Sequence, residues 1–356
     1  MGIDIFEMLK RFARIISYDY RQRNGIFRIL WKSAARWNRL GWDGMLEWLD
    51  KEIWKIPNQQ KILHIDTNAY RHWIQVREFQ RFHSETSYDD LKFSIILAPE
   101  NNDASLSRII NSLIEQHHQN WELLLLSESF DIQEGNDGRI VFIGECLQQS
   151  RIVRYNRGLS LATGEWIIFA DEKMVFSPFA LVEIAIAIQA NSAAELIYTD
   201  EDIIDEDGKR STPHFKSDFN PDLLYSMSYI GRAFGTRLGT ARAVGGLSQS
   251  ASLCADYDFV LRLWEYAGEK AIFHIPKIVF HFEKDEVDTS MRHSCEQQVL
   301  REYFARRNEK VSIASGTCPQ THRLHWSLPD TLPFVTIIIP TRDQLEVLQK
   351  CIESIL

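Results

Sequence analysis

Several features are absent from this sequence of 356 residues, and each absence excludes a class of protein. No apolar run approaches the ~18–20 residues that a membrane-spanning helix requires, and the first residues show no signal-peptide pattern. The five cysteines include no Cys-x-x-Cys pair, which argues against a zinc site or a disulfide framework and favours reduced thiols. These residues are Cys146, Cys254, Cys295, Cys318 and Cys351. A formal net charge of −9 disfavours a nucleic-acid partner, so we expect a cytoplasmic protein that does not bind nucleic acid.

The N-terminal part of the chain differs in composition from the rest. Residues 1–80 are net basic, although the whole chain is acidic, and they hold six of the ten tryptophans. Apolar residues between Ile5 and Ile16 fall on one helical face, which predicts an amphipathic helix within a helical extension over residues 1–90. Two interpretations stay open. Either the aromatic side chains pack on the following domain, or residues 1–55 lie on the cytoplasmic face of the inner membrane.

From residue 91 onward, short apolar runs alternate with amphipathic segments. Strands are predicted at 93–97, 121–126, 166–170, 195–199, 231–236 and 271–282. Helices are predicted at 104–116, 156–163, 178–190, 221–227, 256–267 and 296–308. This alternation is typical of a mainly parallel, doubly wound α/β sheet sandwiched by helices, here over residues 91–310. Residues 311–333 are predicted to be a linker.

Two carboxylates follow one of the predicted strands. A small-residue helix that begins with Asn156 leads through Gly164 into the apolar run 166–170, after which come Asp171, Glu172 and Lys173. Ligands of open α/β sheets bind beyond the carboxyl ends of the strands. Carboxylate oxygens suit Mg²⁺ or Mn²⁺ bridging a diphosphate, whereas the ammonium of Lys173 has the wrong sign for a metal ligand.

This segment resembles the core of a family-2 glycosyltransferase with the GT-A fold. The downstream motifs resemble a bacterial branch of that family which builds cell-surface polysaccharides, and they follow in the same order over roughly residues 90–300. They are Ile197 to Asp202, Asp207 to Arg210, Phe215 to Asp222, Val244 to Leu247, Asp256 to Arg262 and His274 to His281. The resemblance implies a nucleoside diphosphate sugar as donor and a glycan or lipid-linked acceptor.

The resemblance also assigns roles to individual residues. Asp256 is implied to be the catalytic base, although an Asp just before an apolar-periodic helix also serves as a helix N-cap. Mn²⁺ or Mg²⁺ would be held by Asp171, Glu172 and the strand-end His281. The candidate contacts to the nucleotide sugar are Asn101, Glu128, Asn156, Asp171 and Lys173. The carboxylates of Asp200, Glu201 and Asp202 belong either to the site or to a solvated hairpin.

Three donor-site signatures depart from the family pattern. The first strand leads into Ala98-Pro99-Glu100-Asn101, with only the Asn in place, and the second ends in Ser127-Glu128 rather than in paired aspartates. In the third, Lys173 occupies a ligand position. An ammonium about 5 Å from a divalent cation would cost about 6–7 kcal/mol at an effective dielectric constant of about 20. Three outcomes stay open: no useful metal site, a weakened metal site, or Lys173 binding the phosphates directly.

The last residues of the sequence resemble the first predicted strand and helix of the sheet domain. Residues 334–356 align without gaps to residues 92–114, with identities that include Ile95 with Ile337, Ile110 with Ile352 and Ser112 with Ser354. We therefore interpret 334–356 as the start of a second, truncated GT-A domain. Two functions are compatible with the whole pattern. One is transfer of a sugar to a bacterial surface glycan such as O-antigen, capsule or exopolysaccharide. The other is a catalytically silent domain that binds glycan or scaffolds an active second domain.

Overall fold

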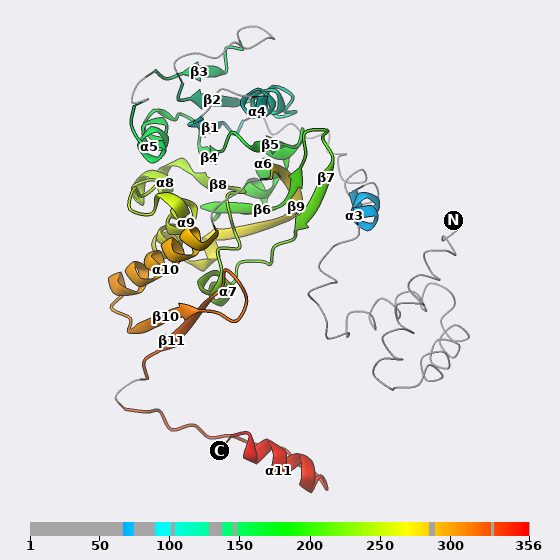
Figure 1. Cartoon of the computed structure of the whole chain (residues 1–356), viewed down its shortest axis with the longest axis vertical. Helices are drawn as coiled ribbons and strands as arrows, with labels where there is room; N and C mark the ends of the chain where they lie inside the picture. The colour runs from blue at the N-terminus through cyan, green and yellow to red at the C-terminus, as the bar shows by residue number, and fades with distance from the viewer. Residues whose placement is uncertain are drawn as a thin grey trace, which may run out of the picture. The chain divides into compact units, whose positions relative to one another are not determined.

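A computed structural model describes residues 67–74, 90–100, 104–127, 137–144, 148–284, 289–328 and 331–355. The predicted N-terminal helices before residue 67, together with Asn101 and Glu128, lie outside these residues. The chain divides into two units, residues 1–81 and 82–356. In the first unit, helix α3 (Thr67–Trp73) is the described element (Figure 1). No helix among the described residues is long and apolar enough to cross a membrane.

The second unit is built on one nine-stranded sheet with the strand order β3-β2-β1-β4-β8-β6-β9-β5, and β7 pairs with β6 (Figure 1). The strands are β1 (Phe93–Leu97), β2 (Trp121–Leu125), β3 (Ile140–Phe142), β4 (Trp166–Ala170), β5 (Met174–Phe176), β6 (Leu196–Ile204), β7 (Arg210–His214), β8 (Phe234–Arg237) and β9 (Ile272–Glu283). Strands β3, β2, β1 and β4 run parallel, as do β6 and β9. The junctions of β8 with β4 and β6, of β5 with β9 and of β7 with β6 are antiparallel.

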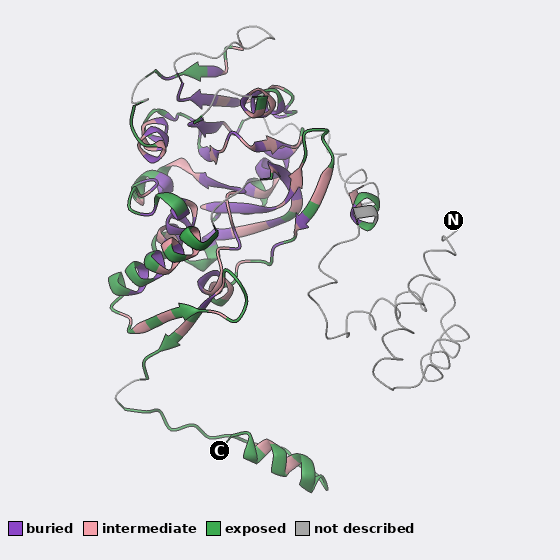
Figure 2. Cartoon of the chain, in the orientation of Figure 1, coloured by how far each residue is buried: buried purple, intermediate pink, exposed green. Residues whose placement is uncertain are grey.

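Helices cover both faces of this sheet. They are α4 (Ala104–Ile114), α5 (Arg151–Leu161), α6 (Ala180–Ala190), α7 (Pro221–Ser226), α8 (Leu238–Ala243), α9 (Ala255–Ala267) and α10 (Thr289–Arg306). Successive residues of a strand point to opposite faces. In β1, Phe93 and Ile95 accordingly join one hydrophobic core with α4 and α6, while Ile96 joins a second core with α5, α8 and α9. The central strands are buried on both sides (Figure 2). The predicted α/β sandwich is confirmed.

The Asn-x-Gly sequence of α5 has a packing cause. A Cβ atom at Gly158 would lie 2.4 Å from Cγ2 of Ile96, so only glycine lets this helix approach β1 so closely. The helix begins at Arg151, five residues before the predicted start, and thereby brings the Arg151 side chain next to the end of β4.

The region after α10 differs from its prediction. Residues 311–333 were expected to form a linker, but β10 (Val311–Ser315) and β11 (His322–Trp326) form an antiparallel hairpin. Leu324 and Val311 pack against the core that contains α9 and α10, which explains why this stretch is ordered.

At the C-terminal end, helix α11 (Leu345–Glu353) forms, whereas residues 334–340 pair with no strand among the residues that the structure describes. Phe334 is 94% exposed and Ile338 is 86% exposed. The second-domain interpretation of this segment remains a prediction.

The expectation of reduced thiols is wrong for two cysteines. Cys254, in the short helix η3 (Ser252–Cys254), forms a disulfide with Cys295 of α10. The two residues are 41 positions apart in the sequence, so local spacing gives no sign of the pair. Among the residues that the structure describes, Cys318 and Cys351 form no disulfide.

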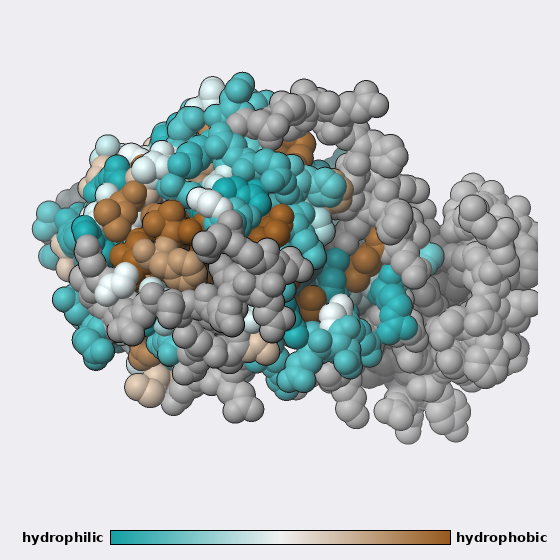
Figure 3. Space-filling view, turned by 90° about the horizontal axis from the view of Figure 1, so that it is seen from above, coloured by the Kyte–Doolittle hydropathy of each residue, from teal (hydrophilic) through white to brown (hydrophobic). Residues whose placement is uncertain are grey.

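The edge of the sheet that is formed by β3 carries exposed apolar side chains. Edge strand β3 leaves Val141 43% and Phe142 36% exposed. Seen from that end, hydrophobic side chains gather in a patch within a mostly hydrophilic surface (Figure 3).

Candidate functional site

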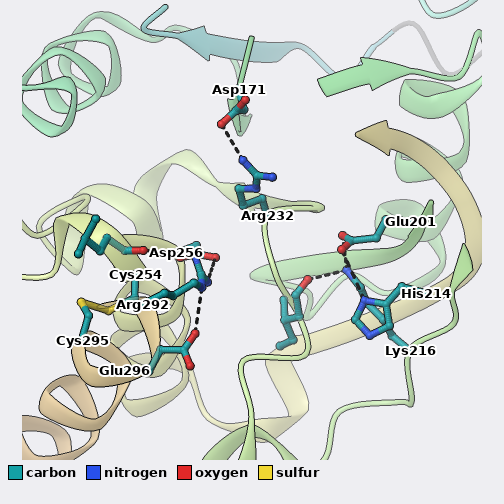
Figure 4. Close-up of polar contacts among 12 residues, drawn as sticks. Asp171, Glu201, His214, Lys216, Arg232, Cys254, Asp256, Arg292, Cys295 and Glu296 are labelled. Carbon is teal, nitrogen blue, oxygen red and sulfur yellow. Dashed lines mark hydrogen bonds and ion pairs between the residues drawn. A yellow bond between two sulfur atoms is a disulfide. The ribbon is translucent and has the colours of Figure 1, made fainter. Parts of the chain in front are cut away.

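A cavity of about 720 Å³ lies where α5, α9 and α10 meet the sheet. Its charged lining includes Arg151, Asp171, Glu201, Arg232, Asp256 and Arg292. Figure 4 shows that the carboxylates of Asp171, Glu201 and Asp256 come from different elements and that each has a basic partner. Volumes of about 300–1,000 Å³ are typical of small-molecule sites. The cavity is therefore large enough for a ligand and is lined by charges of both signs.

Asp171 occupies the position directly after β4 and is held by two arginines. Its Oδ2 lies 2.8 Å from Nη1 of Arg232 and 3.3 Å from Nη2 of Arg151. Arg151 also contacts Glu172 at 2.5 Å. Burial by itself would raise the pKa of Asp171, but Arg232 and Arg151 hold it below its usual value. Burial raises the pKa of Glu172 despite Arg151. Asp171 is therefore an ionised carboxylate whose charge is already balanced.

Residues 171–174 form a tight turn between β4 and β5. The Lys173 N–H donates to Oδ1 of Asp171 at 2.9 Å, and the Met174 N–H donates to the Asp171 carbonyl at 2.9 Å. Asp commonly stabilises turns in this way. The Lys173 carbonyl accepts from the N–H of Glu283. Lys173 is not among the described residues that line the cavity.

The three residues predicted to bind Mn²⁺ or Mg²⁺ do not come together. His281 contacts Asp202 at 2.5 Å through Nδ1, and it borders a different hollow, on the α4 side of the sheet. Within the described part of the chain, one group of histidine and acidic residues has converging ligand atoms, and it contains none of the three. Because Asp171 and Glu172 are neutralised by guanidinium groups and His281 lies elsewhere, this donor set does not fit a divalent cation.

Asp256 lies in the first turn of α9, but it is not the N-cap, which is Cys254. Its Oδ2 lies 2.8 Å from Nη2 of Arg292, whose Nε lies 3.0 Å from Oε1 of Glu296 (Figure 4). Asp256 raises the pKa of Arg292 further, against the effect of burial. The Cys254–Cys295 disulfide joins the start of α9 to α10 beside these residues. The candidate base therefore lines the cavity at the start of a helix that a disulfide links to α10.

Of the three carboxylates in β6 whose placement the sequence left open, Glu201 lines the cavity. Asp200 accepts from the backbone N–H of Lys216, and Asp202 pairs with Arg210 and His281. The ammonium of Lys216 is fully buried and lies 2.8 Å from Glu201. Burial alone would raise the pKa of Glu201, but Lys216 and His214 lower it to about 2.

Asn156 positions the cavity wall. Its Nδ2 donates to the Leu247 carbonyl at 2.8 Å, and its Oδ1 accepts from the Leu247 N–H at 2.9 Å. Leu247 lines the cavity, whereas Asn156 is not among the lining residues. Gly246 has φ of +69°, and a Cβ there would lie 2.4 Å from Oδ1 of Asn156. Helix α5, which contains Asn156, and the Val244–Leu247 motif are thus held in direct contact.

Sequence reasoning missed the basic residues of the site. Arg151, Arg232 and Arg292 come from segments far apart in the chain, so no spacing pattern links them to their acidic partners. The signal that was available for Lys216 is its place within the Phe215–Asp222 motif.

Comparisons with known proteins give related sequences, and no protein-family model matches the chain. An uncharacterized protein (y4gI) of Sinorhizobium fredii is 32% identical over 281 residues, which are 74% of this chain and 31% of that protein. The O-antigen biosynthesis protein RfbC of Myxococcus xanthus is 28% identical over 71% of this chain and 21% of its own length. A PGL/p-HBAD biosynthesis glycosyltransferase of Mycobacterium tuberculosis is 29% identical over 48% of this chain and 68% of its own length.

These similarities confirm the resemblance seen in the sequence motifs, which is to bacterial glycosyltransferases of the family-2 type. The chain spans only about a fifth to a third of the length of the first two relatives.

Proposed function

We propose that this chain, a relative of bacterial glycosyltransferases of the family-2 type, transfers a sugar from a nucleoside diphosphate sugar to a glycan or lipid-linked acceptor. The observation that carries the proposal is the shared cavity of Asp171, Glu201 and Asp256. These residues come from three separate motifs of the family pattern, and the cavity wall also contains three arginines. A cavity that combines carboxylates with guanidinium groups suits a hydroxyl acceptor together with an anionic donor.

Asp256 is proposed as the general base. The acceptor hydroxyl gives its proton to the Asp256 carboxylate while its oxygen attacks the anomeric carbon of the donor sugar. The bond between that carbon and the phosphate oxygen breaks, and the electron pair leaves with the nucleoside diphosphate. General-base assistance of this kind contributes typically about 10²–10⁴-fold to the rate. Arg292 acts as a positioning residue, because it fixes the carboxylate against the cavity wall.

The leaving diphosphate needs positive charge, and the arginines are the proposed source. Arg151 and Arg232 line the cavity and each contacts Asp171. A guanidinium has five N–H donors in a planar fork that matches phosphate oxygens, so donors remain after the ion pairs of Arg151 with Asp171 and Glu172 and of Arg232 with Asp171. The proposed donor site therefore works without Mn²⁺ or Mg²⁺ at Asp171. Asn156 acts indirectly, by holding Leu247 in the wall.

The acceptor proposal rests on the relative whose name places it in O-antigen biosynthesis. We propose a bacterial surface glycan as acceptor and the cytoplasmic face of the inner membrane as the place of reaction. Nucleoside diphosphate sugars are the proposed small-molecule partners. The proposed membrane contact through residues 1–55 is supported by their basic, tryptophan-rich composition.

The proposal is tested with a panel of UDP-, GDP- and dTDP-sugars, incubated with the full chain and with lipid-linked glycans extracted from a bacterial envelope. The readout is release of the free nucleoside diphosphate together with a mass increase of the glycan by one sugar. Release with a single nucleotide class supports the proposal. Absence of both readouts for every donor would favour the alternative, a silent domain that binds glycan or scaffolds another transferase.

A further inference from the structure

A group of two histidines and one glutamate, of which His293 and Glu296 line the cavity, does not include Asp171. His293 and Glu296 come from α10, and His322 comes from β11. Each offers one ligand atom, and the three atoms lie within 4.8 Å of one another. The imidazole rings of His293 and His322 stack with centroids 4.6 Å apart. The spacing of three residues on α10 puts His293 and Glu296 on neighbouring turns, and the β10–β11 hairpin brings His322 against them.

Each of the two imidazole rings has one buried nitrogen that makes no hydrogen bond to the described residues. The side chain of His322 is completely buried, and its Nε2 lies 3.2 Å from Oε2 of Glu296. Within the part of the chain that the structure describes, Nδ1 of His322 and Nδ1 of His293 have no hydrogen-bond partner. An unsatisfied buried polar atom costs about 1–3 kcal/mol. Two such atoms in stacked rings beside a buried carboxylate are better explained by a ligand than by stability of the fold.

The charges around the group favour a cation. Glu296 is 5% exposed and shares Arg292 with Asp256, so two carboxylates face a single guanidinium. The three side chains together carry a net charge of −1, which offsets part of the charge of a divalent ion. His293 and Glu296 also line the cavity, which gives an ion a route from solvent. Imidazole nitrogens with one carboxylate oxygen are ligands that suit Zn²⁺ and related transition metals, and sites with three protein ligands keep a further position open.

We propose that His293, Glu296 and His322 bind a divalent transition-metal ion of the zinc class, with its open coordination position directed to the cavity. This site is distinct from Asp171 and does not depend on the proposed sugar transfer. The ligand atoms must draw closer on binding, since metal–nitrogen bonds are about 2.0–2.1 Å. Small rotations of the half-buried His293 side chain provide that movement.

The test is a calorimetric titration of the untagged full chain with Zn²⁺ alone, followed by Co²⁺, whose absorption spectrum reports coordination geometry. We expect one equivalent of metal to bind. His322→Ala and His293→Gln should each weaken binding by more than about 100-fold, since even partners outside the ligand shell change metal affinity by about 10–100-fold. His325→Ala is the matched control, because His325 lies on the same strand but is exposed. Asp171→Asn is a second control, which tests whether the metal ion binds instead at Asp171, at the end of β4.

The expected result is loss of binding in both ligand variants and unchanged binding in the His325 and Asp171 variants. No binding to the wild-type chain, or equal binding in His293→Gln and wild type, would overturn the proposal. If circular dichroism shows that His322→Ala does not fold, His293→Gln decides the test alone, because His293 is only partly buried.

Discussion

Nη1 of Arg232 lies 2.8 Å from Oδ2 of Asp171, directly after the last residue of β4. Arg151 approaches the same oxygen at 3.3 Å. The carboxylate that the family pattern assigns to a metal is therefore neutralised by the protein itself. The same two arginines bring positive charge to the cavity wall. In the proposed donor site, these guanidinium groups supply the positive charge that a metal ion would otherwise bring to the diphosphate.

The first prediction concerns Arg232. Arg232→Gln should weaken binding of a nucleoside diphosphate about 10- to 100-fold, because hydrogen bonds to charged groups contribute about 1.5–3 kcal/mol. The measurement is calorimetric titration. Arg301→Gln is the control, since Arg301 is exposed on α10 and does not line the cavity. Equal losses in both variants would mean that the effect is a general change of charge rather than a contact in the site.

The second prediction concerns the candidate base. Asp256→Asn should lower the rate of sugar transfer by about 10²–10⁴-fold while the fold is retained, because the amide does not accept the proton of the acceptor hydroxyl. The measurement is the initial rate of nucleoside diphosphate release. Asp222→Asn provides a matched control in the first turn of α7, where the side chain is exposed. An unchanged rate in Asp256→Asn would remove this residue from the mechanism.

The third prediction concerns the buried pair of Glu201 and Lys216. Glu201→Gln should lower the free energy of unfolding by about 3–5 kcal/mol, because it leaves a buried ammonium without its counter-charge. The double variant Glu201→Gln with Lys216→Met should be more stable than Glu201→Gln alone. Urea denaturation measures both. A double variant that is less stable than the single one would show that Glu201 is not the main partner of Lys216.

The same pair predicts a dependence on pH. The pKa of Glu201 falls from 4.5 to about 2 on folding, so its contribution to stability is complete above pH 4.5 and is lost as the pH falls toward 2. The stability difference between wild type and Glu201→Gln should therefore shrink over this acidic range. A difference that stays constant down to pH 2 would contradict the lowered pKa.

The fourth prediction concerns the disulfide. The Cys254–Cys295 bridge closes a loop of 41 residues, for which loop entropy gives a stabilisation of about 4 kcal/mol. Reduction should lower the thermal midpoint of the wild type, whereas Cys254→Ser should begin at the lower value and not respond to reductant. Cys318→Ser is the control because Cys318 is free. A response to reductant that survives in Cys254→Ser would assign the effect to other thiols.

The fold was predictable because local patterns determine most of it. The apolar runs of β1, β2 and β4 are buried on both faces, so their sequences differ clearly from the helices between them. The β10–β11 hairpin was missed because its strands are short and half exposed, and they pack on α9 and α10 only through a few residues.

The lining of the candidate site was predictable only in part. Asp171 and Asp256 follow from motifs, because a strand end and a helix start fix where a side chain points. The partners of these residues depend on tertiary contacts. His281 illustrates the limit, since the register between β6 and β9 puts it opposite Asp202 rather than beside Asp171. Lys173 likewise turns out to close a tight turn, which its charge alone did not indicate.

The most direct test of the central claim is isothermal titration of the full chain with UDP, GDP and dTDP, each in Mn²⁺ and in EDTA. The arrangement of Arg151, Arg232 and Asp171 predicts that one of these nucleotides binds with micromolar affinity, equally well in both conditions. Absence of binding to all three, or binding that requires Mn²⁺, would contradict a donor site in which arginines replace the metal.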